Sequence, residues 1–283
     1  MTAIARLGRL PGGTAGEPGA VERWLRRARF YLPAAVVFVA VIVGWEIVVG
    51  ALGLRAFIFP RPSQIWTALV ENWEGSRYPL FASARATLFE ALLGLAIGTS
   101  AGVAVAFATA RWVTARDVLL PLAVAANAIP IIAFAPLLNN WFGLLNPLSK
   151  AMMAAILVFF PVMANVTRGL VQVDPAAIEL MRSYAASEWT ILRKVRVPNM
   201  LPFFFTALKL ASTLSLIGAI VAEYFGGSSA VLGRIIVQSA SALSFDITWA
   251  AIILGAAAGI VMYLVIVALE RLVIPWHGSL RTE

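Results

Sequence analysis

Six long apolar stretches divide this chain, near residues 31–52, 86–109, 118–139, 149–169, 203–224 and 248–269. Each is about as long as the ~20 residues that an α-helix needs to cross the hydrocarbon core of a bilayer. Hydrophobic residues fill 61% of the 283 positions and charged residues only 13%, which is too little polar surface for a soluble protein of this size. The sequence therefore predicts an all-α integral membrane protein with six transmembrane helices and both ends on the same side.

The basic residues predict which side that is. With the N-terminus in the cytoplasm, sixteen of the 22 lysines and arginines fall in cytoplasmic segments. The others lie outside: Arg55, Arg61, Arg77, Arg85, Lys150 and Arg234. Cytoplasmic loops are enriched in Lys and Arg, so we expect a multi-pass protein of the bacterial plasma membrane with the N- and C-termini in the cytoplasm. The net charge of +8 then reflects this topology and not a nucleic-acid partner.

The N-terminal region differs in composition from the rest of the chain. Residues 1–30 hold six arginines and a run rich in Gly and Pro, without an apolar core. We expect a cytoplasmic tail followed by a basic juxtamembrane helix, because the apolar span that comes next is too long for a cleavable signal peptide. Residues 31–283 are expected to form the transmembrane domain.

One charged segment, ELMRSYAASEWTILRKVRVP, interrupts the apolar pattern in the second half of the chain. Shortly before it, Asp174 and the proline that follows predict the start of a short helix. Ser187 predicts the N-cap of a second helix, which we expect to end before Pro198, since proline has no amide hydrogen to donate. With Ala185 as a small-residue joint, residues 173–198 are predicted to form a helical hairpin whose exposed aromatic and aliphatic side chains are typical of a protein contact.

Polar side chains inside the apolar stretches are candidates for lining a solute path. We expect this path to include one group from the third stretch and one from the fifth: Asn127, Pro130, Asn139, Asn140, Ser212, Ser215 and Glu223. Prolines free carbonyl groups at membrane depth, and such breaks are tolerated where protein or a water-filled cavity satisfies them. Two alternatives stay open, because the serines can instead make interhelical hydrogen bonds and Glu223 can pair with Arg234.

Several classes of protein are excluded by what the sequence lacks. The chain has no cysteine and its one histidine is His277, so we expect no metal site, no catalytic residue and no histidine-based triad. It has no Gly-x4-Gly-Lys-Ser/Thr run, so it does not bind a nucleotide through a P-loop. An ion-coupled secondary transporter stays open as an alternative, with Glu46 and Glu90 as candidate coupling carboxylates, although two related halves are not evident.

The charged segment is similar to the EAA loop of binding-protein-dependent ABC importer permeases. That loop has the usual form Glu-Ala-Ala, three residues, Gly, nine residues, then Ile-x-Leu-Pro, and five residues fall on its positions: Glu179, Ala185, Val195, Val197 and Pro198. The departures are Leu180 and Met181 in place of the two alanines and Ala185 in place of the glycine.

The resemblance covers roughly residues 55–277. FPRPSQIW, ANAIPIIAFAPLLNNWFG, LSKAMMAAILVFFPVMANVTRGL and LERLVIPWH resemble the nitrate, sulfonate and taurine branch of these permeases. NNWFG and RSYAASEW resemble its pyrimidine-precursor and riboflavin members. The resemblance implies a type I ABC importer permease, in which the hairpin is the coupling helix that fits a cleft in an ATPase subunit. The implied coupling residues are Asp174, Glu179, Arg182, Ser183, Tyr184, Ala185, Trp189 and Pro198.

The same resemblance implies the partners and the cargo. We expect ABC ATPase subunits, an extracytoplasmic solute-binding protein, surrounding membrane lipid and a second permease copy, identical or related. ATP and Mg would be bound by the ATPase, so that this chain would hold no cofactor and would be a transport subunit, not an enzyme. The expected solute is a small heteroaromatic compound such as a pyrimidine precursor or riboflavin, with sulfonate, taurine or nitrate anions as the alternative.

Overall fold

The computed structural model describes residues 20–55, 58–112, 118, 121, 130–228 and 230–275, and these ranges contain no β-strand. The chain divides into two units, Met1–Leu54 and Arg55–Glu283. The first unit holds α1 (Ala20–Ala51). The second unit includes these helices among the described residues: α2 (Pro62–Glu71), α3 (Leu80–Arg111), η1 (Ile131–Phe134), α5 (Ala135–Phe142), α6 (Pro147–Val171), α7 (Pro175–Ser183), α8 (Glu188–Ile191), η2 (Leu192–Arg196), α9 (Val197–Tyr224), α10 (Leu232–Ser241) and α11 (Phe245–Val273).

The described part of the first unit is dominated by one long helix, α1. Its part from Leu32 to Ala51 is long and apolar enough to cross a membrane. Large apolar side chains such as Phe38 and Ile47 are mostly exposed on it. An α-helix satisfies its backbone polar groups internally, which is what a segment in lipid requires. This helix matches the first expected span, while residues 1–19 of the expected tail lie outside the described ranges.

The core of the second unit lies where α6 packs against α3 and α9. Along α6, the side chains of Val158, Val162, Val166 and Leu170 are fully buried at every fourth position. Residues four apart share one face of a helix, so this row forms a continuous apolar stripe. α6 is accordingly the most buried of the long helices, and α11 packs against α9 at the side of this core.

Small residues allow α3 to approach α6 closely. Gly94, Gly98 and Gly102 all face α6, and a Cβ atom placed at Gly98 would lie 2.5 Å from the carbonyl oxygen of Ala155. Such a distance leaves no room for any side chain. Glycines four residues apart lie on one face of a helix and permit close backbone contact between helices in membranes.

Five of the expected spans correspond to helices long and apolar enough to cross a membrane within the described ranges: Leu32–Ala51, Leu80–Arg111, Pro147–Val171, Glu188–Tyr224 and Phe245–Val273. The third expected span, 118–139, falls mostly outside those ranges. Its described end forms the 3-10 turn η1 and the start of α5, which are too short to cross.

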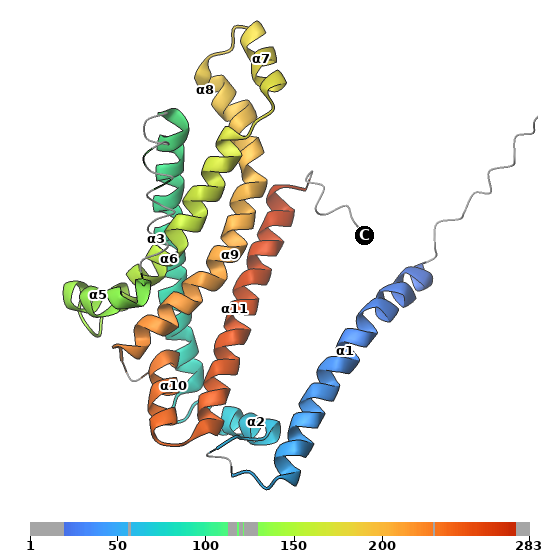
Figure 1. The fold of residues 1–283 in the computed structure, drawn as a ribbon, viewed down its shortest axis with the longest axis vertical. Helices are drawn as coiled ribbons and strands as arrows, with labels where there is room; N and C mark the ends of the chain where they lie inside the picture. Colours follow the sequence, from blue (N-terminus) through green and yellow to red (C-terminus); the bar gives the residue numbers. More distant parts are fainter. Residues whose placement is uncertain are drawn as a thin grey trace, which may run out of the picture. The chain divides into compact units, whose positions relative to one another are not determined.

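The two ends of the second unit carry different elements. α7 and α8 extend beyond the ends of α6 and α9 and form one tip (Figure 1). At the opposite end, α10 packs against α9 and α11, and α2 packs against α11 (Figure 1). Between α9 and α11, α10 is a helix of ten residues whose Leu232 and Ile235 are fully buried.

Candidate functional site

The predicted helical hairpin is present at one tip of the second unit (Figure 1). Both expected caps are confirmed. The side chain of Asp174 accepts a hydrogen bond from the backbone N–H of Ala176 at 2.9 Å. Ser187 Oγ accepts one from the backbone N–H of Thr190 at 3.3 Å. These bonds satisfy N–H groups that the first turn of a helix leaves without partners, so the sequence itself fixes where α7 and α8 begin.

The joint between α7 and α8 has an unusual backbone conformation. Ala185 has a φ of 53°, in the left-handed region that glycine occupies freely and alanine does not. Its N–H still bonds to the carbonyl of Arg182, and the N–H of Ala186 to that of Met181. Across the joint, the Arg182 guanidinium and the Glu188 carboxylate form an exposed ion pair at 3.3 Å. The turn therefore forms with alanine at the position where the EAA loop that this segment resembles usually has glycine.

The expected end of the second helix before Pro198 is wrong. α8 continues through the π-helical turn η2 into α9, and residues 188–224 form one helix of 37 residues. Pro198 lies in the first turn of α9, directly after η2. Proline disrupts a helix because it lacks an N–H and its ring displaces a carbonyl one turn earlier. A π-helical turn changes the hydrogen-bond register at that point, so the helix accommodates the proline without ending.

All eight expected coupling residues are exposed in the structure. No residue of α7 is buried among the described part of the chain. The largest apolar side chains of the hairpin are also open, with Tyr184 77% and Trp189 69% exposed. Large aromatic side chains in water are costly and are typical of a surface that another protein covers.

A hollow of about 600 Å³ lies where the hairpin joins the bundle. Its lining comes from the last turns of α3 and from the helix that leads into α9: Phe107, Ala110, Arg111, Glu188, Trp189, Leu192 and Arg196. The exposed Trp189 side chain thus borders a concave surface that also carries the basic side chains of Arg111 and Arg196.

The residues expected to line a solute path do not gather around one cavity of the described structure. Ser212 and Ser215 are fully buried on α9, and their hydroxyl groups donate to the carbonyls of Lys209 and Ser212 in the same helix, at 2.8 and 2.9 Å. Asn139 is buried on α5, whereas Asn140 and Pro130 are exposed. Asn127 lies outside the described residues.

Glu223 occupies a buried polar cluster and does not pair with Arg234 in the described structure. It is fully buried, and its Oε2 accepts a hydrogen bond from the backbone N–H of Gly233 at 2.6 Å. The Glu90 carboxyl group on α3 and the Lys150 ammonium group on α6 interact with it. Lys150 is 1% exposed and donates to the carbonyl of Leu144, and Glu90 is 5% exposed. Two carboxyl groups and one ammonium group thus meet inside the bundle.

This cluster also fixes α10. The backbone N–H of Leu232 donates to Thr87 Oγ1 at 3.0 Å, beside the bond from Gly233 to Glu223. Both N–H groups belong to the first turn of α10, where intrahelical acceptors are absent. Side chains of α3 and α9 therefore cap α10 and hold its first turn against the bundle.

Two buried charges were missed by sequence reasoning. Lys150 was used only as a marker of topology, and Glu270 was not singled out. Lys209 on α9 donates to both oxygens of Glu270 on α11, at 3.1 and 2.9 Å. The available signal was position, since ionisable residues within apolar spans usually face the protein interior and pair there. No group of three or more His, Cys, Asp or Glu side chains in the described ranges is placed to hold a metal ion.

The chain belongs to the family of binding-protein-dependent transport system inner membrane components, whose family model matches residues 77–276. This family consists of ABC transporter permeases, as the names of the relatives show. A probable ABC transporter permease protein of Haemophilus influenzae is 31% identical over 239 residues, which cover 84% of this chain and 94% of that protein. The expectation of a multi-pass ABC importer permease is therefore confirmed.

Two further relatives carry names that state a cargo. The formylaminopyrimidine transport permease protein ThiX of Halalkalibacterium halodurans is 29% identical over 253 residues, covering 89% of this chain and 99% of that protein. The riboflavin transport system permease protein RibX of Chloroflexus aurantiacus is 30% identical over 260 residues, covering 89% and 93%. Other relatives are named for aliphatic sulfonates, taurine and nitrate.

Proposed function

We propose that this chain imports a small organic solute, delivered by an extracytoplasmic solute-binding protein, and is driven by ATPase subunits that contact the hairpin of α7 and α8. In this proposal, two copies of the permease (or two related chains) form the translocation path. ATP and Mg are bound by the ATPase and not by this chain. The termini and the hairpin lie in the cytoplasm, which agrees with the excess of basic residues at that end.

The observation that carries the proposal is the continuity of the hairpin with a membrane-spanning helix. The second helix of the hairpin and α9 are one helix of 37 residues, which spans roughly 55 Å at 1.5 Å per residue. At its far end, Glu223 holds the first turn of α10 through Gly233. A movement of the hairpin therefore displaces one continuous helix whose other end is hydrogen-bonded to α10. Switching between two such arrangements is the step that ATP would drive.

The proposed solute is a heteroaromatic compound such as a pyrimidine precursor or riboflavin, with sulfonate-type anions second. The names of the two relatives at 29% and 30% identity support this order, because they state a formylaminopyrimidine and riboflavin. The relatives named for sulfonates, taurine and nitrate support the alternative.

Replacing Trp189 tests the proposal. Trp189→Ala should leave the permease in the membrane at normal levels, because the side chain is 69% exposed and supports no core contact. The purified permease should lose its ATPase or keep it without hydrolysis stimulated by loaded binding protein, since large aromatic anchors often carry roughly 2 kcal/mol or more of binding energy. Trp66→Ala is the matched control, because Trp66 is 66% exposed on α2 at the other end. Normal stimulated hydrolysis in Trp189→Ala would contradict the role given to the hairpin.

A further inference from the structure

The short helix α2 has three different faces around its axis. The side chains of Ile65 and Ala68 are buried, and α2 packs against α11. The exposed side carries two rows of side chains that lie next to each other. The polar row is Ser63, Gln64, Thr67 and Glu71, and the apolar row is Trp66 and Val70, followed just after the helix by Trp73. Residues three or four apart share one face of a helix, so one face of α2 is buried, one is polar and one is apolar.

The end of α2 is bonded to the start of α3. The backbone N–H of Leu80 donates to the carbonyl of Asn72 at 3.1 Å. The backbone N–H of Phe81 donates to the carbonyl of Trp73 at the same distance, and the two rings stack with their centres 5.0 Å apart. N–H groups in the first turn of a helix have no acceptor within that helix, so these bonds hold the end of α2 against α3.

The register of α3 indicates the depth at which Trp73 lies. Arg85 is exposed and directly precedes the apolar stretch of residues 86–109, and its guanidinium lies over the Phe81 ring, 5.8 Å from the centre. A charged group in the hydrocarbon core is costly, so Arg85 lies near the edge of that core. Phe81 is one turn further out, which puts the stacked Trp73 ring at the level of the lipid headgroups. α2 lies crosswise to the long helices, so its other residues stay close to this level (Figure 1).

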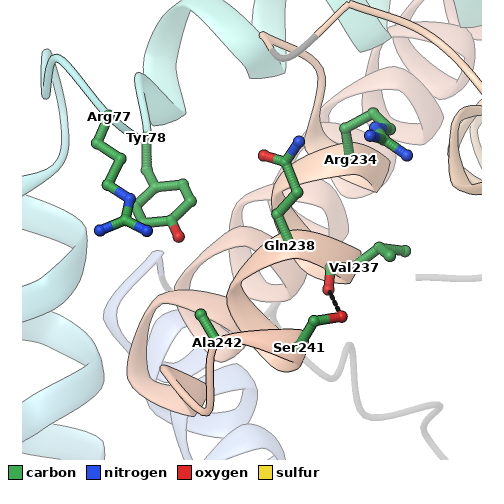
Figure 2. Close-up of a pocket in the computed structure, with 7 residues that line it drawn as sticks. All are labelled: Arg77, Tyr78, Arg234, Val237, Gln238, Ser241 and Ala242. Atoms are coloured by element: carbon green, nitrogen blue, oxygen red, sulfur yellow. Dashed lines mark hydrogen bonds between the residues drawn. The ribbon is translucent and has the colours of Figure 1, made fainter.

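A second arginine lies in the segment that joins α2 to α3. The Arg77 guanidinium lies over the Tyr78 ring, 5.3 Å from its centre (Figure 2). Arg77 and Arg85 are both exposed. Long basic side chains at a membrane surface place their charged ends towards water and the lipid phosphates while their stems cover apolar groups.

The apolar row of α2 continues onto a membrane-spanning helix. Phe81, which stacks on Trp73, is exposed on α3, and Phe89 and Leu92 are exposed two and three turns further along. α3 is long and apolar enough to cross a membrane. The exposed apolar side chains of such a helix are in their preferred environment when they face acyl chains. The same environment therefore extends to the apolar row of α2.

We propose that α2 is an interfacial helix that lies in the headgroup region of the bilayer, with Trp66, Val70 and Trp73 directed towards the acyl chains. Tryptophan suits this level because its ring is apolar and its N–H donates a hydrogen bond. An amphipathic helix of this kind lies in the plane of the membrane and does not cross it. The inference goes beyond the proposed function, which supplies only the leaflet, the outer one. Because α2 also packs against α11, it links that helix to the membrane surface.

Site-directed spin labelling tests the faces of α2 in this cysteine-free chain. Val70→Cys and Thr67→Cys, from the apolar and the polar row, each receive a nitroxide label in the permease–ATPase complex in phosphatidylcholine nanodiscs. Collisions with oxygen, which concentrates in the bilayer, and with a water-soluble nickel chelate report the surroundings of each label. We expect the ratio of oxygen to nickel accessibility to be several-fold higher at Val70→Cys than at Thr67→Cys. Phe89→Cys, on the exposed face of α3, is the reference for the bilayer.

Quenching of tryptophan fluorescence gives an independent measurement. Phosphatidylcholine with brominated acyl chains quenches tryptophans that lie close to them. We expect the quenched fraction of the emission to fall in Trp66→Phe, which removes a tryptophan at the bilayer. Trp189→Phe is the matched control, because Trp189 is about as exposed as Trp66 but belongs to the hairpin at the other end. Its removal should not lower the quenched fraction.

Two results would overturn the inference. Equal nickel accessibility at Val70→Cys and Thr67→Cys would show that the apolar row faces water. A Val70→Cys label that neither reagent reaches would show that protein covers the row, and broadening of its spectrum by a neighbouring label would identify that protein as a second copy of this chain. Hydrolysis stimulated by loaded binding protein, measured on the same complexes, tests the proposed function separately. Stimulated hydrolysis with either of these two results rejects the interfacial helix alone.

Discussion

At the scale of single residues, the joint of the hairpin is a position where sequence and backbone conformation disagree. Ala185 adopts a φ of 53°, which costs an L-residue with a side chain roughly 1–2 kcal/mol. The family pattern places glycine at this position, and glycine adopts that conformation without the penalty. The hairpin therefore forms in this chain at a local cost that its caps and the pair between Arg182 and Glu188 offset.

Removing that cost should stabilise the hairpin. We expect Ala185→Gly to slow hydrogen exchange of the α7 and α8 amides by a factor that corresponds to about 1 kcal/mol. Ala185→Val should do the opposite, because a β-branched side chain tolerates a positive φ least. Ala186→Gly is the control: the neighbouring residue has no positive φ, so glycine there brings only added chain entropy. Equal exchange in Ala185→Gly and wild type would show that the joint carries no strain.

The buried charges give a second prediction at this scale. Lys150 is a buried ammonium group that donates to the carbonyl of Leu144 and whose charge acts on both Glu90 and Glu223 inside the bundle. We expect Lys150→Met to destabilise the permease by about 1–3 kcal/mol, because it leaves that carbonyl without its donor and removes a positive charge near two buried carboxyl groups. Thermal unfolding in detergent measures this loss. The double variant Lys150→Met with Glu90→Gln should recover part of it, and Lys194→Met, at an exposed site, should change little.

At the scale of elements, the helix from Glu188 to Tyr224 determines how the hairpin acts on the bundle. A continuous helix transmits displacement and rotation along its axis, whereas a flexible break would absorb both. The π-helical turn Leu192–Arg196 keeps this continuity past Pro198. The second helix of the hairpin, which contacts the ATPase in the proposed function, is thus part of the same continuous helix that crosses the membrane.

Breaking that continuity should separate binding from coupling. We expect a Gly-Gly insertion between Arg196 and Val197 to leave the hairpin surface intact and the ATPase bound. Glycine has the highest conformational freedom of any residue, so the insertion should uncouple α9 from the hairpin and remove hydrolysis stimulated by loaded binding protein. The same insertion after Leu54, between the two units of the chain, is the control and should retain stimulation. Stimulated hydrolysis at the wild-type rate after the first insertion would show that force does not pass through this helix.

The elements also show which features local sequence predicts and which it does not. The lengths of the apolar stretches predicted five of the membrane-spanning helices correctly. The capping residues Asp174 and Ser187 predicted where α7 and α8 begin, because a cap acts within the first turn of its helix. The passage through Pro198 was not predictable from the proline rule alone, since it depends on the hydrogen-bond register of the preceding turn. The cluster of Lys150, Glu90 and Glu223 was equally hidden, because it joins three helices that are far apart in sequence.

At the scale of the whole molecule, the two serines of α9 that are expected on the solute path are buried in the described conformation. Ser212 and Ser215 are fully buried, and their hydroxyl groups are bonded to carbonyls of their own helix. An importer that alternates between two openings needs such residues to meet water in only part of its cycle. Ser212 and Ser215 can therefore be buried in this conformation and still line the path, if the helices packed against α9 move apart during the transport cycle.

This gives a prediction for the assembled transporter, for which the absence of cysteine provides a clean background. We expect Ser212→Cys to be inert to a water-soluble thiol reagent in the complex without nucleotide, and to be labelled during turnover with ATP and loaded binding protein. Ile217→Cys is the control for lipid exposure, because Ile217 lies on the same helix, 54% exposed on an apolar face, and should stay unlabelled throughout. Tyr184→Cys should react in the free permease and be protected when the ATPase binds. If Ser212→Cys remains inert in every nucleotide state while Tyr184→Cys behaves as expected, the hairpin is a docking element and the path runs elsewhere than along α9.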